Sequence, residues 1–183
     1  MARTNLEGGL GLGEEEFERF YAGTSAALWA YLRRLGGDPA LADDILQESY
    51  VKLLGRVDPA SEEREKRAYL YRIATNLLRD RWRQERREVL GLSSLLGRWE
   101  ERGRAADAPL KVDLESAFQR LEPRERAILW LAYVEGYDHR EIAGIVGVKE
   151  GSVRVLLFRA RKKAARELDR KEVSHERYAP TGR

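Results

Sequence analysis

Apolar side chains recur every three or four residues along most of the chain, the spacing typical of helices with one buried face. Gly36-Gly37 interrupts the first stretch as glycine does after a helix, and Asp38-Pro39 and Pro123 stand where new helices begin. No alternating strand pattern of useful length occurs, which favours an all-α fold. The spacing predicts helices over about residues 14–35, 40–54, 63–88, 113–120, 123–134 and, with a break near Gly147, 138–169.

Residues 91–112 disperse Gly, Ser, Ala and Pro among few regularly spaced apolar positions, a composition typical of a linker. We therefore expect two small helical domains joined by a flexible linker, the second domain containing a helix-turn-helix. The expected units are an N-terminal tail at 1–13, a first domain at 14–92, a linker at 93–112, a second domain at 113–171 and a C-terminal tail at 172–183.

Composition excludes several kinds of site. The 183 residues include no cysteine and only two histidines, so a disulfide framework, a Cys-ligated zinc site and a thiol nucleophile are excluded, and a Ser/His/Asp hydrolase is disfavoured. No apolar run approaches the roughly 20 residues of a membrane span, and the N-terminus lacks a signal-peptide core. We expect a cytoplasmic, non-enzymatic protein with no catalytic residues, metal, cofactor, small-molecule substrate or membrane insertion.

The formal net charge of +3 conceals alternating blocks of charge. The net charge is −6 over residues 1–63, +6 over 64–104, −3 over 105–148 and +6 over 149–171. Basic blocks suit polyphosphates, because neutralised phosphates release condensed counterions. Solvated Arg-rich surface is the alternative, but two separate basic segments favour a nucleic-acid partner.

Residues 139–161 predict a helix-turn-helix. Ala143 is small enough for two helices to cross closely, Gly147 permits a left-handed turn, and Val153 locks the second helix inward. Ser152 is the predicted N-cap of that second helix. Cations on its outward face suit phosphate and major-groove contacts, although an ordinary helical hairpin can show the same spacing. The outward side chains are Arg154, Phe158, Arg159 and Lys162, with Phe158 either half-buried on the preceding helix or in contact with a thymine methyl or sugar.

The long helix of the first domain mixes aromatic and basic residues over 68–83. This mixture suits single-stranded nucleic acid, whose bases stack while cations follow the phosphates. A core helix with aromatic anchors is the alternative, and it is the better interpretation for Tyr71 and Trp82. Upstream, a polar docking face is more plausible than a metal site, because no further acid or histidine accompanies the four polar side chains Asp43, Asp44, Gln47 and Glu48.

These motifs together resemble the extracytoplasmic function sigma factors of bacterial RNA polymerase, and the resemblance covers about residues 14–171. Residues 43–50 (DDILQESY) are similar to the helix that docks on the polymerase β′ clamp, and residues 69–76 with Asp80 are similar to the promoter-melting segment. Residues 121–126 (LEPRER) and Gly136-Tyr137, followed by the helix-turn-helix, are similar to region 4.

The resemblance implies a promoter-specificity subunit that brings recognition and strand opening to the polymerase. The implied partners are core RNA polymerase, through its β and β′ subunits, promoter DNA and an anti-sigma factor. Region 2 (14–92) would bind the polymerase through Asp43, Asp44, Gln47 and Glu48. It would bind the −10 element through Lys66, Tyr69, Arg72, Asn76, Arg79 and Arg83. Region 4 (113–171) would bind the −35 element through Ser152, Arg154, Val155, Phe158, Arg159 and Lys162.

Two segments depart from the family pattern. The loop expected to capture a −10 base carries Glu62, Glu63 and Glu65, which are unfavourable beside a DNA backbone. The recognition helix carries Val155 and Leu156 where the family often has a hydroxyl and a cation. We therefore expect a different −35 sequence, a weaker affinity for the −35 element, or a protein contact through these two side chains.

Two other functions remain open at this point. A stand-alone helix-turn-helix regulator would bind duplex DNA without polymerase and use its first domain for dimerisation or ligand sensing. A helical interaction protein, acting as an anti-sigma factor or scaffold, would not contact DNA at all.

Overall fold

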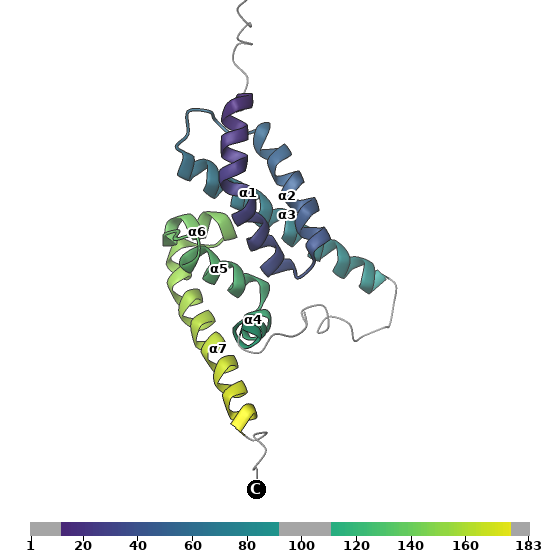
Figure 1. Ribbon diagram of the computed structural model, residues 1–183, viewed down its shortest axis with the longest axis vertical. Coiled ribbons are helices and arrows are strands. Elements are labelled where there is room, and N and C mark those ends of the chain that lie inside the picture. Colours follow the sequence, from purple (N-terminus) through teal and green to yellow (C-terminus); the bar gives the residue numbers. More distant parts are fainter. Residues whose placement is uncertain (1–11, 92–110, 177–183) are drawn as a thin grey trace, which may run out of the picture.

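The computed structural model describes residues 12–91 and 111–176, and every regular element in these two ranges is an α-helix (Figure 1). The N-terminal domain contains α1 (Glu14–Gly36), α2 (Pro39–Leu54) and α3 (Glu63–Gly91). The C-terminal domain contains α4 (Lys111–Gln119), α5 (Pro123–Tyr133), α6 (His139–Val146) and α7 (Glu150–Glu176). The all-α prediction is confirmed, and each predicted helix is present. Three segments lie outside the described ranges: residues 1–11 of the expected N-terminal tail, residues 92–110 with most of the expected linker, and residues 177–183 of the expected C-terminal tail. The last two residues of the expected linker, 111 and 112, belong to α4 instead. No described helix is both long and apolar enough to span a bilayer.

Local signals place the helix ends, as expected from the sequence. Gly37 adopts φ 77° after α1, and its N–H donates to the carbonyl of Arg33 at 3.0 Å. The Asp38 carboxylate then accepts from the Ala40 N–H at 2.9 Å, and Pro39 occupies the first position of α2, where no N–H is needed. The α1–α2 connection is therefore determined by three consecutive residues.

The N-cap predicted at Ser152 is wrong. The second helix of the helix-turn-helix begins at Glu150, so Ser152 lies inside its first turn. The reason lies in the turn itself: the N–H groups of Gly147 and Val148 both donate to the Ala143 carbonyl, at 2.9 and 3.0 Å. Because α6 ends in this tight turn, the chain is helical again from Glu150, before the position that the Ser152 hydroxyl indicated.

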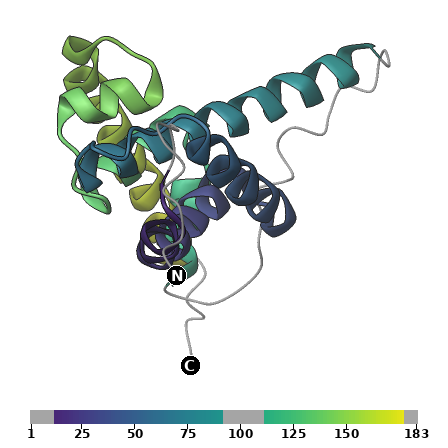
Figure 2. The ribbon, with the colours of Figure 1, turned by 90° about the horizontal axis from the view of Figure 1, so that it is seen from above.

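The N-terminal domain is a three-helix unit in which α1, α2 and α3 pack against one another. Its core is wholly buried at Leu28, Tyr31, Leu32, Ile45, Leu53, Leu70 and Tyr71. The C-terminal half of α3 projects away from this unit (Figure 2). In the C-terminal domain, α4, α5 and α6 all pack on α7.

The two domains share one continuous set of buried side chains. Helix α3 lies along α6 and α1 lies along α5, so the promoter-melting segment expected from the sequence is packed against the helix-turn-helix. Nothing in the sequence pattern predicted which helices meet across the two domains.

Candidate nucleic-acid interface

The predicted helix-turn-helix is present as α6, a three-residue turn and α7. Gly147 adopts φ 73°, a conformation that costs glycine little, and Ala143 and Val153 are buried where the two helices cross. Asp138 begins α6 with a capping box: its carboxylate accepts from the Glu141 N–H at 2.8 Å, and the Glu141 carboxylate accepts from the Asp138 N–H at 2.8 Å. Helix α6 is therefore capped at both ends, by Asp138 at its start and by the turn at Gly147 after its end.

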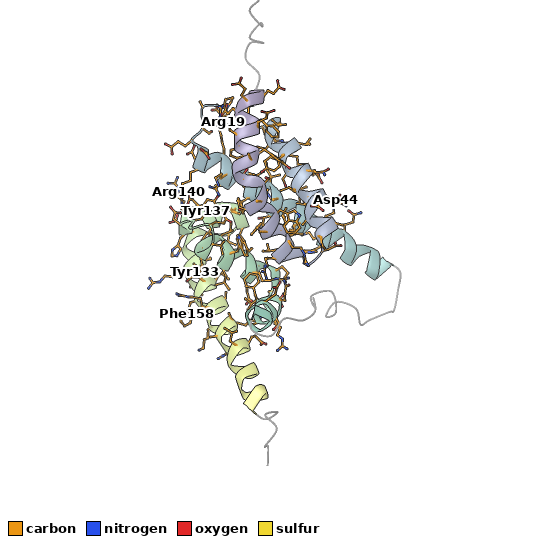
Figure 3. All side chains as sticks on the ribbon, viewed as in Figure 1. Arg19, Asp44, Tyr133, Tyr137, Arg140 and Phe158 are labelled. Carbon is orange, nitrogen blue, oxygen red and sulfur yellow. The ribbon has the colours of Figure 1, made fainter. Side chains whose placement is uncertain are left out.

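The outward face of α7 carries a row of exposed cationic and apolar side chains. Val155 and Phe158 are 48% and 58% exposed, so Phe158 is not half-buried on the preceding helix. Figure 3 shows Phe158 pointing away from the body of the protein. Leu156 instead packs partly against the core, and Ser152 is partly buried. The row consists of Arg154, Val155, Phe158, Arg159 and Lys162, all exposed.

The residues predicted to bind the −10 element have mixed exposure along α3. Arg72 and Arg83 are exposed, whereas Tyr69, Asn76 and Arg79 are half-buried. Arg79 donates to the side-chain oxygen of Asn76. Two aromatic residues of this helix lie inward, as predicted: Tyr71 is fully buried, and Trp82 packs against the core.

Lys66, the sixth residue of that set, lies inside the N-terminal domain. Only 7% of it is exposed, and its ammonium donates to Glu16 Oε1 at 2.6 Å and to the Pro59 carbonyl at 2.7 Å. It ties α3 to α1 and to the preceding loop. A direct DNA contact needs these bonds to break, and its role at the −10 element stays a prediction.

The polar face of α2 points away from the C-terminal domain. Asp44 lies on the opposite side of the molecule from Tyr133 and Phe158 (Figure 3). Asp43 accepts from the Trp29 indole at 2.7 Å, and Glu48 pairs with Lys52 at 2.9 Å. Asp44 and Gln47 are exposed and contact no other described side chain through a hydrogen bond or ion pair. Among the described residues, no group of three potential metal ligands forms.

An ion pair joins the two domains between the first turn of α3 and the first turn of α6. Arg64, on the first turn of α3, donates through Nε to Glu141 Oε1 at 2.5 Å and through Nη2 to Oε2 at 2.8 Å. Its Nη2 also donates to the Gly136 carbonyl at 3.1 Å, and its guanidinium lies 5.4 Å from the Tyr137 ring centroid. The hydrogen bond from Arg64 lowers the pKa of the Glu141 carboxyl below its usual range.

Comparison with known proteins identifies the family. Residues 20–88 match the family model for Sigma-70 region 2, and residues 111–163 match the model for Sigma-70, region 4. The ECF RNA polymerase sigma factor SigL of Mycobacterium tuberculosis is 32% identical over 143 residues, which are 74% of this chain and 79% of that protein. The chain is an extracytoplasmic function sigma factor. The sigma-E factor of Streptomyces avermitilis is similar too, with 29% identity over 160 residues, 86% of this chain and 88% of that one.

Solved structures share the fold. The sigma factor RpoE from Bartonella quintana, crystallised with the anti-sigma factor NepR, has a TM-score of 0.67 and 20% identity over 85% of this chain and 98% of that one. Sigma factors direct RNA polymerase to promoters, bind core polymerase and promoter DNA, and have no enzymatic activity of their own. The matched ranges place region 2 on the N-terminal domain and region 4 on the C-terminal domain.

The geometry of the turn in this sigma factor predicts opposite effects for two glycine substitutions. Gly147→Ala forces a side chain into a left-handed conformation, so we expect the free energy of unfolding to fall by about 1 kcal/mol. Gly144→Ala, in the middle of α6 and with open space around its Cβ position, is the matched control. It should raise the free energy of unfolding by up to about 1 kcal/mol. Urea unfolding followed by circular dichroism measures both, and equal effects would contradict the turn assignment.

Sequence reasoning missed the residues that join the two domains. Arg64 and Arg67 contribute from α3, while Glu135, Tyr137 and Glu141 contribute from the segment around the start of α6. These residues lie about 70 positions apart in the sequence. One indirect indication of this contact was present in the sequence: the Glu-rich segment around Arg64 is unfavourable as a loop that contacts DNA.

Proposed function

We propose that region 2 (14–92) captures and opens the −10 element through α3 and that region 4 (113–171) reads the −35 element through α7. The observation that carries the proposal is the exposed row on α7. Cations in this row suit phosphates and guanine, and its apolar members suit thymine methyl groups. On α3, Tyr69 and the cations Arg72, Arg79 and Arg83 supply stacking and phosphate contacts, with Asn76 beside an unstacked base.

The polar face of α2 is the proposed docking surface for the β′ subunit of core polymerase. Its exposure and its position away from region 4 support this role, because a bound polymerase would then leave α7 accessible to DNA. Asp44 and Gln47 form no hydrogen bond or ion pair with the other described residues, so both side chains can bond to a partner.

Transcription with purified core polymerase tests this proposal. The sigma factor should bind promoter duplexes weakly by itself and support promoter-dependent run-off transcripts only together with core enzyme. A stand-alone regulator would bind its site tightly in a gel shift without polymerase. Tight free binding combined with no promoter-dependent transcript would contradict the proposal.

We also propose an anti-sigma factor as a regulatory partner. The structural relatives that support this include RpoE in complex with NepR and CnrH in complex with the cytosolic domain of CnrY. The proposed site of action is the cytoplasm, where polymerase and promoter DNA are found. Co-purification of the sigma factor from its own cells, followed by mass spectrometry of the bound proteins, identifies such a partner.

The apolar members of the row on α7 predict a dependence on thymine methyl groups. A −35 element selected from randomised duplexes with holoenzyme should contain a thymine whose replacement by deoxyuridine weakens binding about fourfold, the effect of one buried methyl group. Phe158→Ala or Val155→Ala should abolish that difference. Tyr133→Ala, which removes an exposed aromatic of α5, should retain it. An unchanged deoxyuridine effect in both α7 variants would remove these side chains from base readout.

A further inference from the structure

Lys66 is a buried cation where three segments of the N-terminal domain meet. Only 7% of the residue is exposed, and it lies at the start of α3, directly after the loop of residues 55–62 that joins α2 to α3. Its ammonium donates to Glu16 Oε1 of α1 at 2.6 Å and to the Pro59 carbonyl of the loop at 2.7 Å. Figure 1 shows this loop, which we call the α2–α3 loop, beside the N-terminal half of α1. One side chain therefore holds the loop and the start of α3 against α1.

The α2–α3 loop is also ordered by bonds of its own. The Asp58 carboxylate accepts from the Ala60 N–H at 2.9 Å, and the Asp58 carbonyl accepts from the Ser61 N–H at 3.1 Å, which closes a turn. Pro59 lies inside this turn and restricts its backbone further. The ammonium of Lys66 then links the turn to α1, so the position of the loop depends on that one cation.

The charges around the loop do not favour ordering by DNA. Over residues 55–65, four carboxylates outnumber two guanidinium groups. One of these two guanidinium groups, that of Arg64, is already bonded to Glu141. The glutamates of this stretch, Glu62, Glu63 and Glu65, are all exposed. Because phosphates repel such a segment, the protein itself has to hold the loop in place before a promoter strand arrives.

The loop adjoins the surface proposed to hold the −10 strand. Tyr69 follows Lys66 by three residues, so the two side chains lie on neighbouring turns of one face of α3. Arg72 lies one turn further along this face and is exposed. A base stacked on Tyr69 would therefore have the α2–α3 loop as its neighbour toward the start of α3.

We infer that Lys66 is a positioning residue for −10 recognition: it holds the α2–α3 loop as a preformed wall beside the base stacked on Tyr69 and does not itself contact DNA. The inference rests on the proposed binding of the −10 strand by α3. A preformed wall discriminates well between bases, because no binding free energy is spent on ordering it. Without the bonds of Lys66 the loop is free to move, so strand binding weakens and the preferred base is distinguished less well.

Glu16→Ala tests this role sharply, because positioning and simple electrostatics predict opposite signs. If charge alone matters, removing an acid strengthens binding to a phosphate backbone. Loss of the bond to Lys66 should instead weaken binding of the holoenzyme to a labelled single strand with the −10 sequence of a selected promoter, by about three- to tenfold. Glu15→Ala is the matched control: it removes an exposed acid from the same helical turn, whose side chain has no hydrogen bond or ion pair with the other described residues. It should not weaken binding. Stronger or unchanged binding by Glu16→Ala would overturn the inference.

Lys66→Met removes the ammonium and keeps an unbranched side chain of similar length. It should weaken strand binding by a similar factor and reduce the preference for one base at one −10 position, while binding of the −35 duplex stays unchanged. Lys66→Arg retains donors for both acceptors and should restore most of the base preference. In Lys66→Met the slope of log affinity against log salt concentration should equal that of the wild type. A slope lower in magnitude by about one unit would show a phosphate contact of Lys66 and contradict the positioning role.

A nitroxide label measures the loop directly, without DNA. The chain contains no cysteine, so Ala60→Cys provides a unique, exposed attachment site in the α2–α3 loop. In the free full-length protein, electron paramagnetic resonance should show a more mobile label with Lys66→Met or Glu16→Ala than with Glu15→Ala or no further change. Equal mobility in every background would contradict the inference. If circular dichroism shows that Lys66→Met does not fold, Glu16→Ala still decides the outcome.

A comparison of strands separates this inference from the function on which it rests. Wild-type holoenzyme should prefer the −10 strand of its selected promoter to a strand of scrambled sequence. If it has no such preference, both the proposed function of α3 and the role of Lys66 fail. If the wild type has the preference and Glu16→Ala retains it at full affinity, only the positioning role of Lys66 is overturned.

Discussion

Replacing Arg154 with alanine is expected to lower the affinity of the polymerase holoenzyme for its promoter by about tenfold or more. Arg154 is exposed near the start of α7 and forms no hydrogen bond or ion pair with the other described residues. Its guanidinium is therefore available to a guanine edge in the major groove, a contact of about 1–3 kcal/mol. Because the side chain supports nothing else in the described structure, the free energy of unfolding should stay unchanged.

Filter binding with holoenzyme, at one fixed salt concentration, measures the effect of Arg154→Ala. A loss of base readout should also relax specificity at one position of the −35 element, whereas a loss of phosphate contact would weaken all sequences alike. Arg124→Ala, at the exposed start of α5, is the matched control and should have little effect. Undiminished promoter binding by Arg154→Ala would exclude this residue from −35 recognition.

Asp44→Ala combined with Gln47→Ala is expected to weaken binding to core polymerase by at least about tenfold. Both side chains are exposed on one face of α2 and can offer hydrogen-bond acceptors to a partner. Truncating one partner of a charged hydrogen bond at an interface costs about 2 kcal/mol or more. Asp43 is a less informative target, because its bond to Trp29 ties α2 to α1 and its loss also affects stability.

Fluorescence anisotropy of labelled sigma factor titrated with core polymerase measures this loss. Glu18→Ala, which removes an exposed acid from α1, controls for the change in net charge and should bind normally. The free double variant should unfold at the same urea concentration as the wild type. A dissociation constant equal to that of the wild type would remove Asp44 and Gln47 from the docking surface.

The helices could be predicted from the sequence because their signals are local. The apolar spacing defines each buried face, and Gly37, Pro39 and Pro123 stand next to or at the helix ends they predict. Ser152 was misassigned because a hydroxyl at a helix start resembles a cap wherever it stands in the first turn. The exposed row on α7 was also predictable, since the inward phase of Val153 and Leu157 determines which neighbours face outward.

The contacts between the two domains could not be predicted in the same way. Arg64 and Glu141 lie 77 positions apart, and a chain with 34 basic and 31 acidic residues offers far too many pairs to choose from. The burial of Lys66 depends likewise on Glu16, 50 positions away on another helix. These contacts depend on how different helices pack against one another. The periodicity of side chains within a single helix therefore does not predict them. Charge patterning indicated a DNA-binding protein, but the domain contacts emerged only from the structure.

Photo-cross-linking in the open promoter complex tests most directly that α3 and α7 hold two different promoter elements. A benzophenone-bearing phenylalanine is introduced in place of Tyr69 on α3 or Phe158 on α7, and holoenzyme is assembled on a selected promoter. We predict that the probe at Tyr69 labels the non-template strand of the −10 element and that the probe at Phe158 labels the −35 duplex, about 25 base pairs away. Labelling of one element by both probes, or of neither element by either, would contradict the account.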